Sequence, residues 1–600
     1  MKKITLIIFL LFYSYSFSQN YINGFIFDKS SNKSLPYATI RLISDKDYYT
    51  ITNEDGKFEF LNKFALDSIE VRYIGYRSKK VPLSYFKNNP KLLLEQEVYN
   101  LNSVNIIVKK EKDYSYKLLF RLIKKYRNNK KIVKSKGFLN LNTSVKGVPL
   151  EIIEGFYNSE HTLSKGITDL KIKSGRFGQN RSFPFYSLNS TDILKDFQLF
   201  NISHQILPQY PGNLALNVIK RKYKVKIDPC DNCSYDDMVL SFVPKKLNGR
   251  LFFGKIIFNK ETLTIKKIEL GINNPTTYRL TSIIKNHEVI PKEIILNINF
   301  NPNNFEKIQS LDYKFTMYYN SKKSFEIIET NVFLYFYDYY KIFDEPFFTK
   351  SIKFNNDYDK IIALQATNEF WDANYQFPKS FKALKSIEFL KEYGILINYE
   401  NKIPTNDIEF IRPSVISWDK TKRLKWESVK QGLNESENSN KYINRNLSTN
   451  IKADKVYHSS SDIVKKNSFF NNYQSFNFSY LLDKHKDSNG ENKFITRTIF
   501  DRNSSSYKNS RSKNMLVYLN LTFDIYEYYR QKLASEINDE MTFSQVKVLC
   551  NETFKKATQT VEKMKMETNS ALNFQYLMRW NNEIKSKLDI DNYYLISNQK

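Results

Sequence analysis

The sequence predicts a mainly β protein of several domains: an N-terminal β-sandwich, an antiparallel β-rich middle domain and a helical C-terminal segment. Three observations lead to this prediction. Short runs of β-branched and aromatic residues, separated by turn residues, recur between residues 20 and 345. Apolar residues recur at helical spacing near the C-terminal end. The chain has 600 residues, which is enough for roughly three or four domains that each bury a core.

The composition is that of a folded, strongly basic chain. Aromatic residues make up 15% of it, which excludes an intrinsically disordered protein, and three Cys exclude a disulfide-rich scaffold. Lys and Arg number 92 against 63 Asp and Glu, which gives a net charge of +29, but they are scattered along the whole chain. We therefore expect no nucleic-acid partner, and the charge better fits an anionic polysaccharide or lipid surface.

Residues 1–19 have the layout of a secretory signal peptide. Two Lys follow the initial Met, residues 4–13 are almost all apolar, and small Ser residues occupy the −3 and −1 positions of a cleavage site before Gln19. The alternative is a membrane anchor, but residues 4–18 are shorter than the about 20 residues that a spanning helix needs. We therefore expect an exported protein, periplasmic or associated with the outer membrane or cell surface, without a transmembrane helix after cleavage.

Residues 20–108 are predicted to form a small β-sandwich. Asp55 and Gly56 form a hairpin turn signal, because Gly tolerates the positive φ that a tight turn requires. Five short segments rich in β-branched and aromatic residues recur at about ten-residue spacing, which favours a sandwich. The segments are residues 25–27, 38–43, 49–52, 57–60 and 68–73.

Four blocks in this region, and a strand-like run after them, carry a family resemblance. The blocks are GFIFD at 24–28, LPYATI at 35–40, TNEDGKF at 52–58 and IGY at 74–76, followed by LNSVNIIV at 101–108. In this order they resemble the carboxypeptidase-regulatory-like domain over about 90 residues. The resemblance implies a transthyretin-like β-sandwich that acts as a folding or docking module and has no active site of its own.

We expect no carboxypeptidase activity, because zinc carboxypeptidases hold their metal with a His-x-x-Glu pair and a distant His. His287 and Glu288 begin an HExxH-like string, but Pro291 stands at the place of the second ligand. None of the five His has a Glu three residues later, and they are His161, His204, His287, His458 and His485. The prediction is therefore no metal site and no cofactor.

The middle of the chain is predicted as a linking helix at residues 109–133 and an antiparallel β-rich domain at 134–345. The clearest hairpin spans residues 254–270, and we expect a sheet with one solvated face. Further strands are expected at residues 294–300, 311–319 and 325–337. The apolar stripe of the helix is Leu118, Leu119, Leu122, Ile123 and Tyr126.

Cys230 and Cys233 form a CxxC pair between two strand-like segments, which places them at a hairpin tip. In an oxidising compartment we favour a local structural disulfide. A redox role would need a following helix to lower the thiol pKa, and a zinc site would need two further ligands, so both remain weaker alternatives. Cys550 is expected to be unpaired and buried.

The last part of the chain is predicted as a mixed region at 346–433, a partly disordered Ser/Asn/Lys-rich segment at 434–515 and a helical segment at 516–600. A helix is expected at residues 380–393. In the C-terminal segment, Thr542 and Gln545 form a capping box. The stripe of the helix before this box is Phe523, Tyr526, Leu533 and Ile537. The stripe of the helix after it is Val546, Leu549, Phe554, Ala557, Val561 and Met564.

No catalytic constellation is visible. The GxSxG elbow and the Rossmann glycine fingerprint are absent, and residues 249–255 have P-loop spacing but continue with Ile256 where Ser or Thr is required. We therefore expect a non-enzymatic envelope scaffold or binding protein whose partner is another envelope protein or an anionic surface. The alternative is a polysaccharide-binding or polysaccharide-processing protein. Aromatic side chains beside paired carboxylates in a cleft would favour that alternative.

Overall fold

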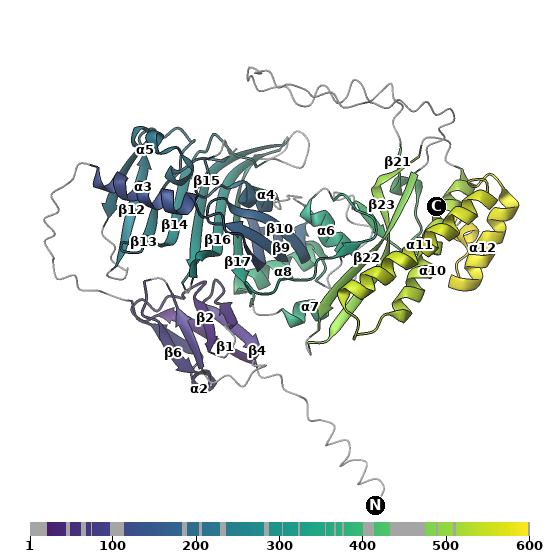
Figure 1. Cartoon of the computed structure of the whole chain (residues 1–600), viewed down its shortest axis with the longest axis horizontal. Coiled ribbons are helices and arrows are strands. Elements are labelled where there is room, and N and C mark those ends of the chain that lie inside the picture. The colour runs from purple at the N-terminus through teal and green to yellow at the C-terminus, as the bar shows by residue number, and fades with distance from the viewer. Residues whose placement is uncertain are drawn as a thin grey trace, which may run out of the picture. The chain divides into compact units, whose positions relative to one another are not determined.

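The computed structural model divides the chain into two compact units, which are described separately (Figure 1). The first unit comprises residues 1–343, 364–410 and 487–490, and the second comprises 344–363, 411–486 and 491–600. The residues that the structure describes are 21–43, 48–61, 68–73, 75–96, 113–182, 189–202, 207–228, 236–280, 287–302, 304–321, 325–354, 356–364, 368–374, 377–399, 413–431, 475–487, 490–507 and 512–597. Among the described helices, none is long and apolar enough to cross a membrane.

The first unit begins with the predicted β-sandwich, which the structure confirms. One sheet has the order β4-β1-β7, and the other has the order β3-β2-β5-β6. Fully buried side chains of both sheets, including Ile26, Phe58, Ile40 and Ile69, form the core between them. The strands are β1 (Tyr21–Asp28), β2 (Thr39–Ile43), β3 (Tyr48–Ile51), β4 (Lys57–Leu61), β5 (Ser68–Arg72), β6 (Lys79–Pro82) and β7 (Lys91–Leu94), and α2 (Tyr85–Asn88) precedes β7.

The turn between β3 and β4 requires its glycine. Gly56 has a φ of +75°, and a Cβ added there would lie 2.6 Å from the carbonyl oxygen of Ile26. We expect Gly56→Val to destabilise the sandwich by about 1–3 kcal/mol or more, because backbone strain and a steric clash act together. Faster amide hydrogen exchange in β1 and β4 measures the loss.

Gly147 provides a matched control for this substitution. Its φ is +81°, but nothing lies within 4 Å of an added Cβ. Gly147→Val therefore carries the backbone strain without the clash, and it should cost less than Gly56→Val. Equal losses at the two positions would show that the contact with Ile26 is unimportant.

The large antiparallel sheet of the first unit contains the middle domain. Its order is β11-β12-β13-β14-β15-β16-β17-β8-β9-β10-β19. The strands are β8 (Val133–Val145), β9 (Val148–Thr162), β10 (Gly166–Asn180), β11 (Tyr223–Asp228), β12 (Asp237–Pro244), β13 (Phe253–Asn259), β14 (Ile265–Asn273), β15 (Glu288–Asn301), β16 (Asn304–Asn320), β17 (Phe325–Tyr337) and β19 (Gly394–Ile397).

The two faces of this sheet differ, as the sequence predicted. In β17, Ile328, Thr330 and Val332 are buried on one face, which we call the inner face, whereas Phe325 and Ile327 are exposed on the outer face. Helix α3 (Tyr114–Arg127) lies across the strands on the inner side (Figure 1), and its five predicted stripe residues are its buried residues. The alternation follows from the period of two in a strand, which sends successive side chains to opposite faces.

Shorter helices complete the first unit. Helix α8 packs on β9 and β10, where Leu390 and Ala383 contact Ile152. It begins after Ser380, whose Oγ accepts a hydrogen bond from the backbone N–H of Ala383. The helices are α4 (Asn189–Asp196), η1 (Pro211–Asn213), α5 (Leu216–Lys222), α7 (Asn368–Ala373) and α8 (Phe381–Tyr393).

The second unit packs a helical layer on a small sheet. Its sheet has the order β18-β22-β23-β20, with β21 also paired to β23. Its strands are β18 (Phe347–Phe348), β20 (Val415–Ser417), β21 (Lys430–Gln431), β22 (Ser475–Lys486) and β23 (Asn492–Tyr507), with η2 (Trp426–Ser428) before β21. Its helices are α10 (Lys513–Glu536), α11 (Phe543–Glu567), α12 (Phe574–Leu588), α13 (Asn592–Ser597) and α6 (Asp357–Leu364), of which α6 belongs to this unit up to residue 363.

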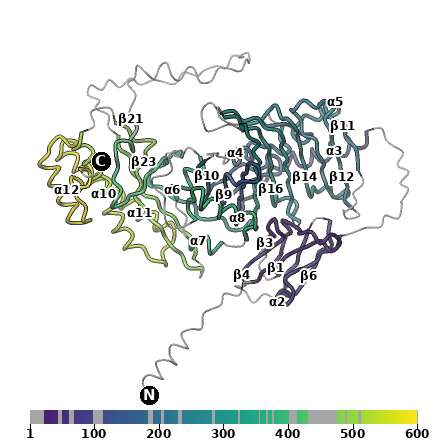
Figure 2. Tube along the Cα trace, turned by 180° about the vertical axis from the view of Figure 1, so that it is seen from behind, coloured from purple at the N-terminus to yellow at the C-terminus, as the bar shows by residue number. Residues whose placement is uncertain are grey.

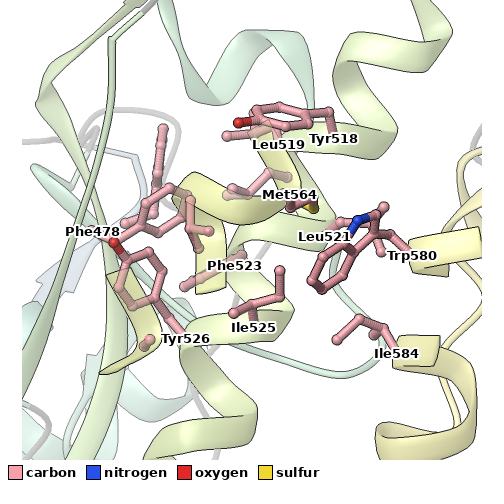
Figure 3. Close-up of a cluster of buried hydrophobic side chains, with 14 of the residues drawn as sticks. Phe478, Tyr518, Leu519, Leu521, Phe523, Ile525, Tyr526, Met564, Trp580 and Ile584 are labelled. Carbon is pink, nitrogen blue, oxygen red and sulfur yellow. The ribbon is translucent and has the colours of Figure 1, made fainter. Parts of the chain in front are cut away.

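Aromatic stacking joins the sheet and the helices of the second unit. Phe478 of β22 stacks on Tyr526 of α10 with ring centroids 5.2 Å apart, and Tyr526 stacks on Phe554 of α11 at 5.0 Å. Figure 3 shows this cluster with Trp580 of α12 beside Leu521 of α10. The predicted capping box is present, because Thr542 accepts from the Gln545 N–H and the Gln545 side chain accepts from the Thr542 N–H.

The strands β22 and β23 lie in the second half of the segment at 434–515, for which the sequence analysis predicted no strands, whereas residues 434–474 of this segment lie outside the described residues. The residues of these two strands alternate between polar and apolar, as in Phe476, Asn477, Phe478, Ser479 and Tyr480. Composition alone hid this pattern, because Ser, Asn and Lys are abundant on the solvent face of a strand as well as in linkers. The helical segment likewise begins at residue 513 rather than 516.

Candidate binding pocket on the outer face of the large sheet

A row of polar side chains crosses the outer face of the large sheet. Cross-strand pairing aligns one residue from each of ten strands, and all of them except Phe333 are polar. The row is Lys226, Ser241, Lys255, Glu269, Asn297, Asp312, Phe333, Asn140, Glu154 and Arg176. A second row, two residues along the strands, contains Lys314, Asn331 and Asn142.

The N-terminal sandwich belongs to the same unit and lies beside the large sheet (Figure 2), and its side chains contact this face. The ring of Tyr37 stacks on Phe333 with centroids 3.9 Å apart and an interplanar angle of 15°. Gln309 Nε2 donates to Thr39 Oγ1 over 2.9 Å, and Asn53 Nδ2 donates to the carbonyl of Lys379 over 3.0 Å. The sandwich is therefore held to the sheet by a ring contact and one hydrogen bond, and to the segment before α8 by another hydrogen bond.

Asp55 adds a charged contact to this junction. Its Oδ2 accepts a hydrogen bond of 2.6 Å from the backbone N–H of Phe381, the first residue of α8. N–H groups in the first turn of a helix have no partner within the helix, and the helix dipole favours a negative charge at this end. The predicted turn residue Asp55 thus also caps a helix that is distant in the sequence.

We expect Asp55→Ala to weaken the junction by roughly 1–2 kcal/mol, because it removes a charge-assisted hydrogen bond. Hydrogen exchange of residues 48–61 and of the first turn of α8 should become about tenfold faster. Asp55→Asn keeps an acceptor at the same position and should retain part of the protection. Wild-type exchange rates in Asp55→Ala would contradict the proposed contact.

A pocket open to solvent lies at the junction, and the about 600 Å³ of space not filled by atoms there includes part of the open solvent at its mouth. Aromatic and apolar residues form part of its wall, and they are Tyr37, Ile51, Phe138, Val332, Phe333, Phe377 and Pro378. Polar residues form the rest, and they are Thr52, Asn53, Glu54, Asn140, Asn142, Asp312, Lys314, Asn331 and Ser380. The two polar rows of the sheet therefore meet the sandwich at this pocket.

One acceptor in the pocket wall is left without a donor. The Oδ1 atom of Asn142 is buried and has no hydrogen-bond partner, whereas its Nδ2 donates to Asn140 Oδ1 over 2.6 Å. A buried carbonyl oxygen without a donor is costly, and this atom has almost no solvent-accessible surface, so it lies behind the pocket wall and not on its surface. Asn331 lies directly across the strand from Asn142.

Tyr37 has an unusual backbone conformation at this pocket. Its φ is +63°, a left-handed value that is rare for a bulky residue. Burial, followed by the nearby charges of Glu54 and Asp312, raises the pKa of its phenol, so the hydroxyl stays protonated. This hydroxyl donates to Glu54 Oε1 over 3.4 Å. Strained residues of this kind concentrate at ligand sites and at junctions.

A buried ion pair lies beside the pocket, across the strand from Asn140. Arg176 Nε donates to Glu154 Oε2 over 2.6 Å, and the hydroxyl of Tyr399 donates to the same oxygen over 3.0 Å. Burial alone would raise the pKa of Glu154, but the charges of Arg176 and Lys379 and these hydrogen bonds outweigh it and lower the pKa. With Trp371 stacked over the guanidinium at 3.8 Å, this cluster fixes α7 and residue 399 to the sheet.

The remaining residues singled out from the sequence have separate outcomes. Cys230 and Cys233 lie outside the described residues, between β11 and β12, so their disulfide stays a prediction that mass mapping of non-reduced protein tests. Cys550 is an unpaired, buried thiol, as predicted. In the described part of the chain, no group of three or more His, Cys, Asp or Glu is arranged to hold a metal ion.

Sequence reasoning did not identify the pocket residues. A signal was present in the alternation Leu139, Asn140, Leu141, Asn142, which places two amides on one face of a strand. The partners of these amides come from β16 and β17 and from the sandwich, and no local pattern connects them.

Comparison with known proteins supports the N-terminal assignment. Residues 22–106 match the model of the CarboxypepD_reg-like domain family, so the chain carries this domain at its N-terminus, as its sequence blocks suggested. No curated protein matches the chain. A solved structure titled as the complex of MucA and MucB from Pseudomonas aeruginosa matches 36% of this chain and 93% of its own, with 8% identity and a TM-score of 0.15. At that score the likeness carries no conclusion.

Proposed function

We propose that the protein is a non-enzymatic binding protein of the cell envelope, and that its CarboxypepD_reg-like domain forms one wall of the binding site. The observation that carries this proposal is the pocket between the sandwich and the outer face of the large sheet. Ligand pockets combine an apolar wall with a few convergent polar groups, and they often lie where two domains meet.

The location rests on the N-terminal sequence. A basic start, an apolar stretch and small residues before Gln19 indicate export, and the pocket opens on a face of polar residues that suits an aqueous compartment. The absence of a recognised catalytic motif in the sequence favours binding over turnover. The partner we propose is another component of the envelope, held at the outer face of the sheet.

Cell fractionation with site-specific crosslinking tests this proposal. A photo-reactive amino acid at Ile327, which is exposed on the outer face of β17, should capture an envelope component in living cells. The same amino acid at Leu247, which is exposed outside the strands, serves as the control and should capture less. Recovery of the chain in the cytosol with residues 1–19 attached would overturn the envelope location, and equal capture at both positions would overturn the site.

A further inference from the structure

Three large apolar side chains project into solvent at one end of the large sheet. Ile132 precedes β8, Ile202 lies in the segment after α4, and Tyr340 follows β17. Their exposed fractions are 60%, 53% and 82% respectively. Single exposed apolar residues are common on protein surfaces, so the groups around these three decide what they do.

Backbone hydrogen bonds bring the two isoleucines to the same place. Ser164, in the turn between β9 and β10, donates its N–H to the carbonyl of Asn129 over 3.1 Å. The carbonyl of Ser164 accepts a hydrogen bond of 2.9 Å from the N–H of Asn201. Ile132 and Ile202 follow these two partners closely in the chain, so they flank the same turn.

The segment that carries Tyr340 lies on the other side of β8. The N–H of Lys136 donates to the carbonyl of Asp338 over 3.4 Å, so the chain after β17 continues beside the start of β8. The ammonium group of Lys307, near the turn between β15 and β16, lies 5.4 Å from the centre of the Tyr340 ring. We call this end of the sheet the end rim, and it consists of residues 128–134, 162–166, 200–202, 304–308 and 338–342.

The end rim is strongly basic, and all of its basic residues are Lys. It contains six Lys and two acidic residues, whereas the whole chain has 92 Lys and Arg against 63 Asp and Glu. Both acidic residues are in ion pairs, because Lys131 Nζ lies 3.5 Å from Glu306 and Lys136 Nζ lies 2.7 Å from Asp338. The six Lys are Lys130, Lys131, Lys134, Lys165, Lys307 and Lys341.

Lys without Arg suits a diffuse layer of negative charge. A Lys ammonium group is a hydrated point charge on a flexible stem, whereas Arg forms bidentate contacts with individual phosphate or carboxylate groups. Anionic headgroups at a bilayer surface form such a diffuse layer, and they attract each nearby Lys. The charge pattern of the end rim therefore favours a surface over a single bound anion.

The apolar side chains distinguish a bilayer from other anionic partners. Below its charged headgroups a bilayer offers an apolar layer, in which isoleucine side chains gain free energy by leaving water. Tyrosine is enriched at the level of the headgroups, because its ring is apolar and its hydroxyl is polar. A hydrated anionic polysaccharide offers the charge but no apolar layer for Ile132 and Ile202.

We propose that the end rim docks the protein on the surface of a lipid bilayer with anionic headgroups. The six Lys contact the headgroups, and Ile132, Ile202 and Tyr340 enter the boundary between headgroups and acyl chains. This inference goes beyond the function proposed above, because the residues that line the pocket lie elsewhere on the sheet. The pocket and the end rim are therefore separate surfaces with separate tests.

Co-sedimentation of the full-length exported protein with lipid vesicles tests this inference. One set of vesicles contains phosphatidylethanolamine and phosphatidylglycerol at about three to one, and the other contains phosphatidylcholine alone. We expect binding to the anionic vesicles, weakened by at least about tenfold between roughly 0.05 and 0.5 M NaCl. A chain with a net charge of +29 is attracted to any anionic surface, so variants must show which of its surfaces makes the contact.

Removal of three charges from the end rim should weaken binding by about a hundredfold, at about fivefold for each Lys close to an anionic surface. The triple variant is Lys130→Gln, Lys165→Gln and Lys341→Gln, and all three residues are exposed. Circular dichroism establishes that the variant is folded.

The matched control removes the same charge from the opposite end of the strands. Strand β14 begins near the end rim, where Lys267 pairs with Asn299 beside the turn between β15 and β16, so the loop between β12 and β13 lies at the other end. This control should weaken binding by less than about tenfold. It is the triple variant Lys224→Gln, Lys245→Gln and Lys246→Gln, which also changes exposed residues.

The apolar contribution has its own pair of variants. Ile132→Ser combined with Ile202→Ser should weaken binding by about fivefold or more, and the loss should persist at high salt because apolar contacts are not screened. Leu247→Ser is the control, since Leu247 is 83% exposed in the loop between β12 and β13. It should leave the affinity within about twofold of the wild type.

Hydrogen exchange of the unaltered protein locates the contact without any substitution. Anionic vesicles should slow the exchange of residues 129–134 and 338–342 by at least about fivefold and leave residues 245–250 unchanged. Protection of residues 245–250 without protection of the end rim would overturn the inference. Equal weakening by the two triple Lys variants would do the same.

Two further results would assign the end rim to a different partner. Tighter binding to soluble polygalacturonate than to the anionic vesicles would replace the bilayer by an anionic polysaccharide. Vesicle binding that the Ile132 and Ile202 substitutions leave unchanged at high salt would show that no apolar layer is entered, which contradicts the docking proposed here.

Discussion

Replacement of Asp524 by alanine is expected to destabilise the second unit by about 3–5 kcal/mol, the range for removing one partner of a buried ion pair. Asp524 is fully buried on α10, and both of its carboxylate oxygens accept from Arg423 Nη2 at 2.7 Å. Trp418 Nε1 and Asn592 Nδ2 donate to the same carboxylate over 2.8 Å. The substitution leaves the Arg423 guanidinium buried without its counter-charge.

Hydrogen exchange of the α10 amides measures this loss as roughly a hundredfold to several thousandfold decrease in protection. A double variant, Arg423→Met with Asp524→Leu, should lose less than Asp524→Ala, because no unpaired charge remains in the core. Glu583→Ala removes the exposed partner of Lys587 on α12 and should cost less than about 1 kcal/mol. Equal effects of Asp524→Ala and Glu583→Ala would show that the buried network is not important for stability.

The elements that the sequence predicted well are those with a local periodic signal. The stripe of α3 consists of the same five residues that the structure buries, and β17 has the predicted bounds, because one face of each packs on the core. The capping box of α11 lies within four residues, so it too was visible in the sequence. The strands β22 and β23 were missed because composition outweighed their alternation.

The candidate pocket could not be predicted in the same way. Its residues come from segments near positions 37, 53, 140, 313, 332 and 378, and only the register between strands brings them together. A shift of one residue in the pairing would move Asn140 and Asn142 to the inner face. The turn residue Asp55 was identified, but its contact with α8 depends on how the sandwich packs on the sheet, for which the sequence holds no local signal.

The buried His161 is expected to make the first unit sensitive to mild acid. It is completely buried on β9, and burial, followed by the charge of Lys307, lowers its pKa from 6.5 to about 3. Its Nε2 accepts a hydrogen bond of 3.2 Å from the backbone N–H of Ile308, which requires that this nitrogen carry no proton. The native state therefore holds the neutral ring.

The direction of the pH effect follows from proton binding in the two states. At pH values between 6.5 and about 3, the unfolded chain protonates His161 and the native state does not, so stability falls as the pH falls. The contribution is complete above pH 6.5 and decreases by about 1.4 kcal/mol per pH unit below it. Carboxylates elsewhere in the chain add to the total acid dependence, and a variant is needed to isolate this residue.

The variant His161→Gln isolates the contribution of this histidine to the acid dependence. Glutamine keeps an acceptor for the Ile308 N–H but does not titrate. The free energy of unfolding, obtained from the exchange of β9 amides at about pH 7.5 and about pH 5, should fall by about 2 kcal/mol more in the wild type than in the variant. Comparing the two proteins at about pH 7.5 measures any stability that the substitution costs through lost packing. That cost is the same at both pH values, so it cancels when the losses on acidification are compared. If both proteins lose the same free energy on acidification, the unfolded and native states bind the same number of protons at His161, and the ring is not held neutral by its surroundings.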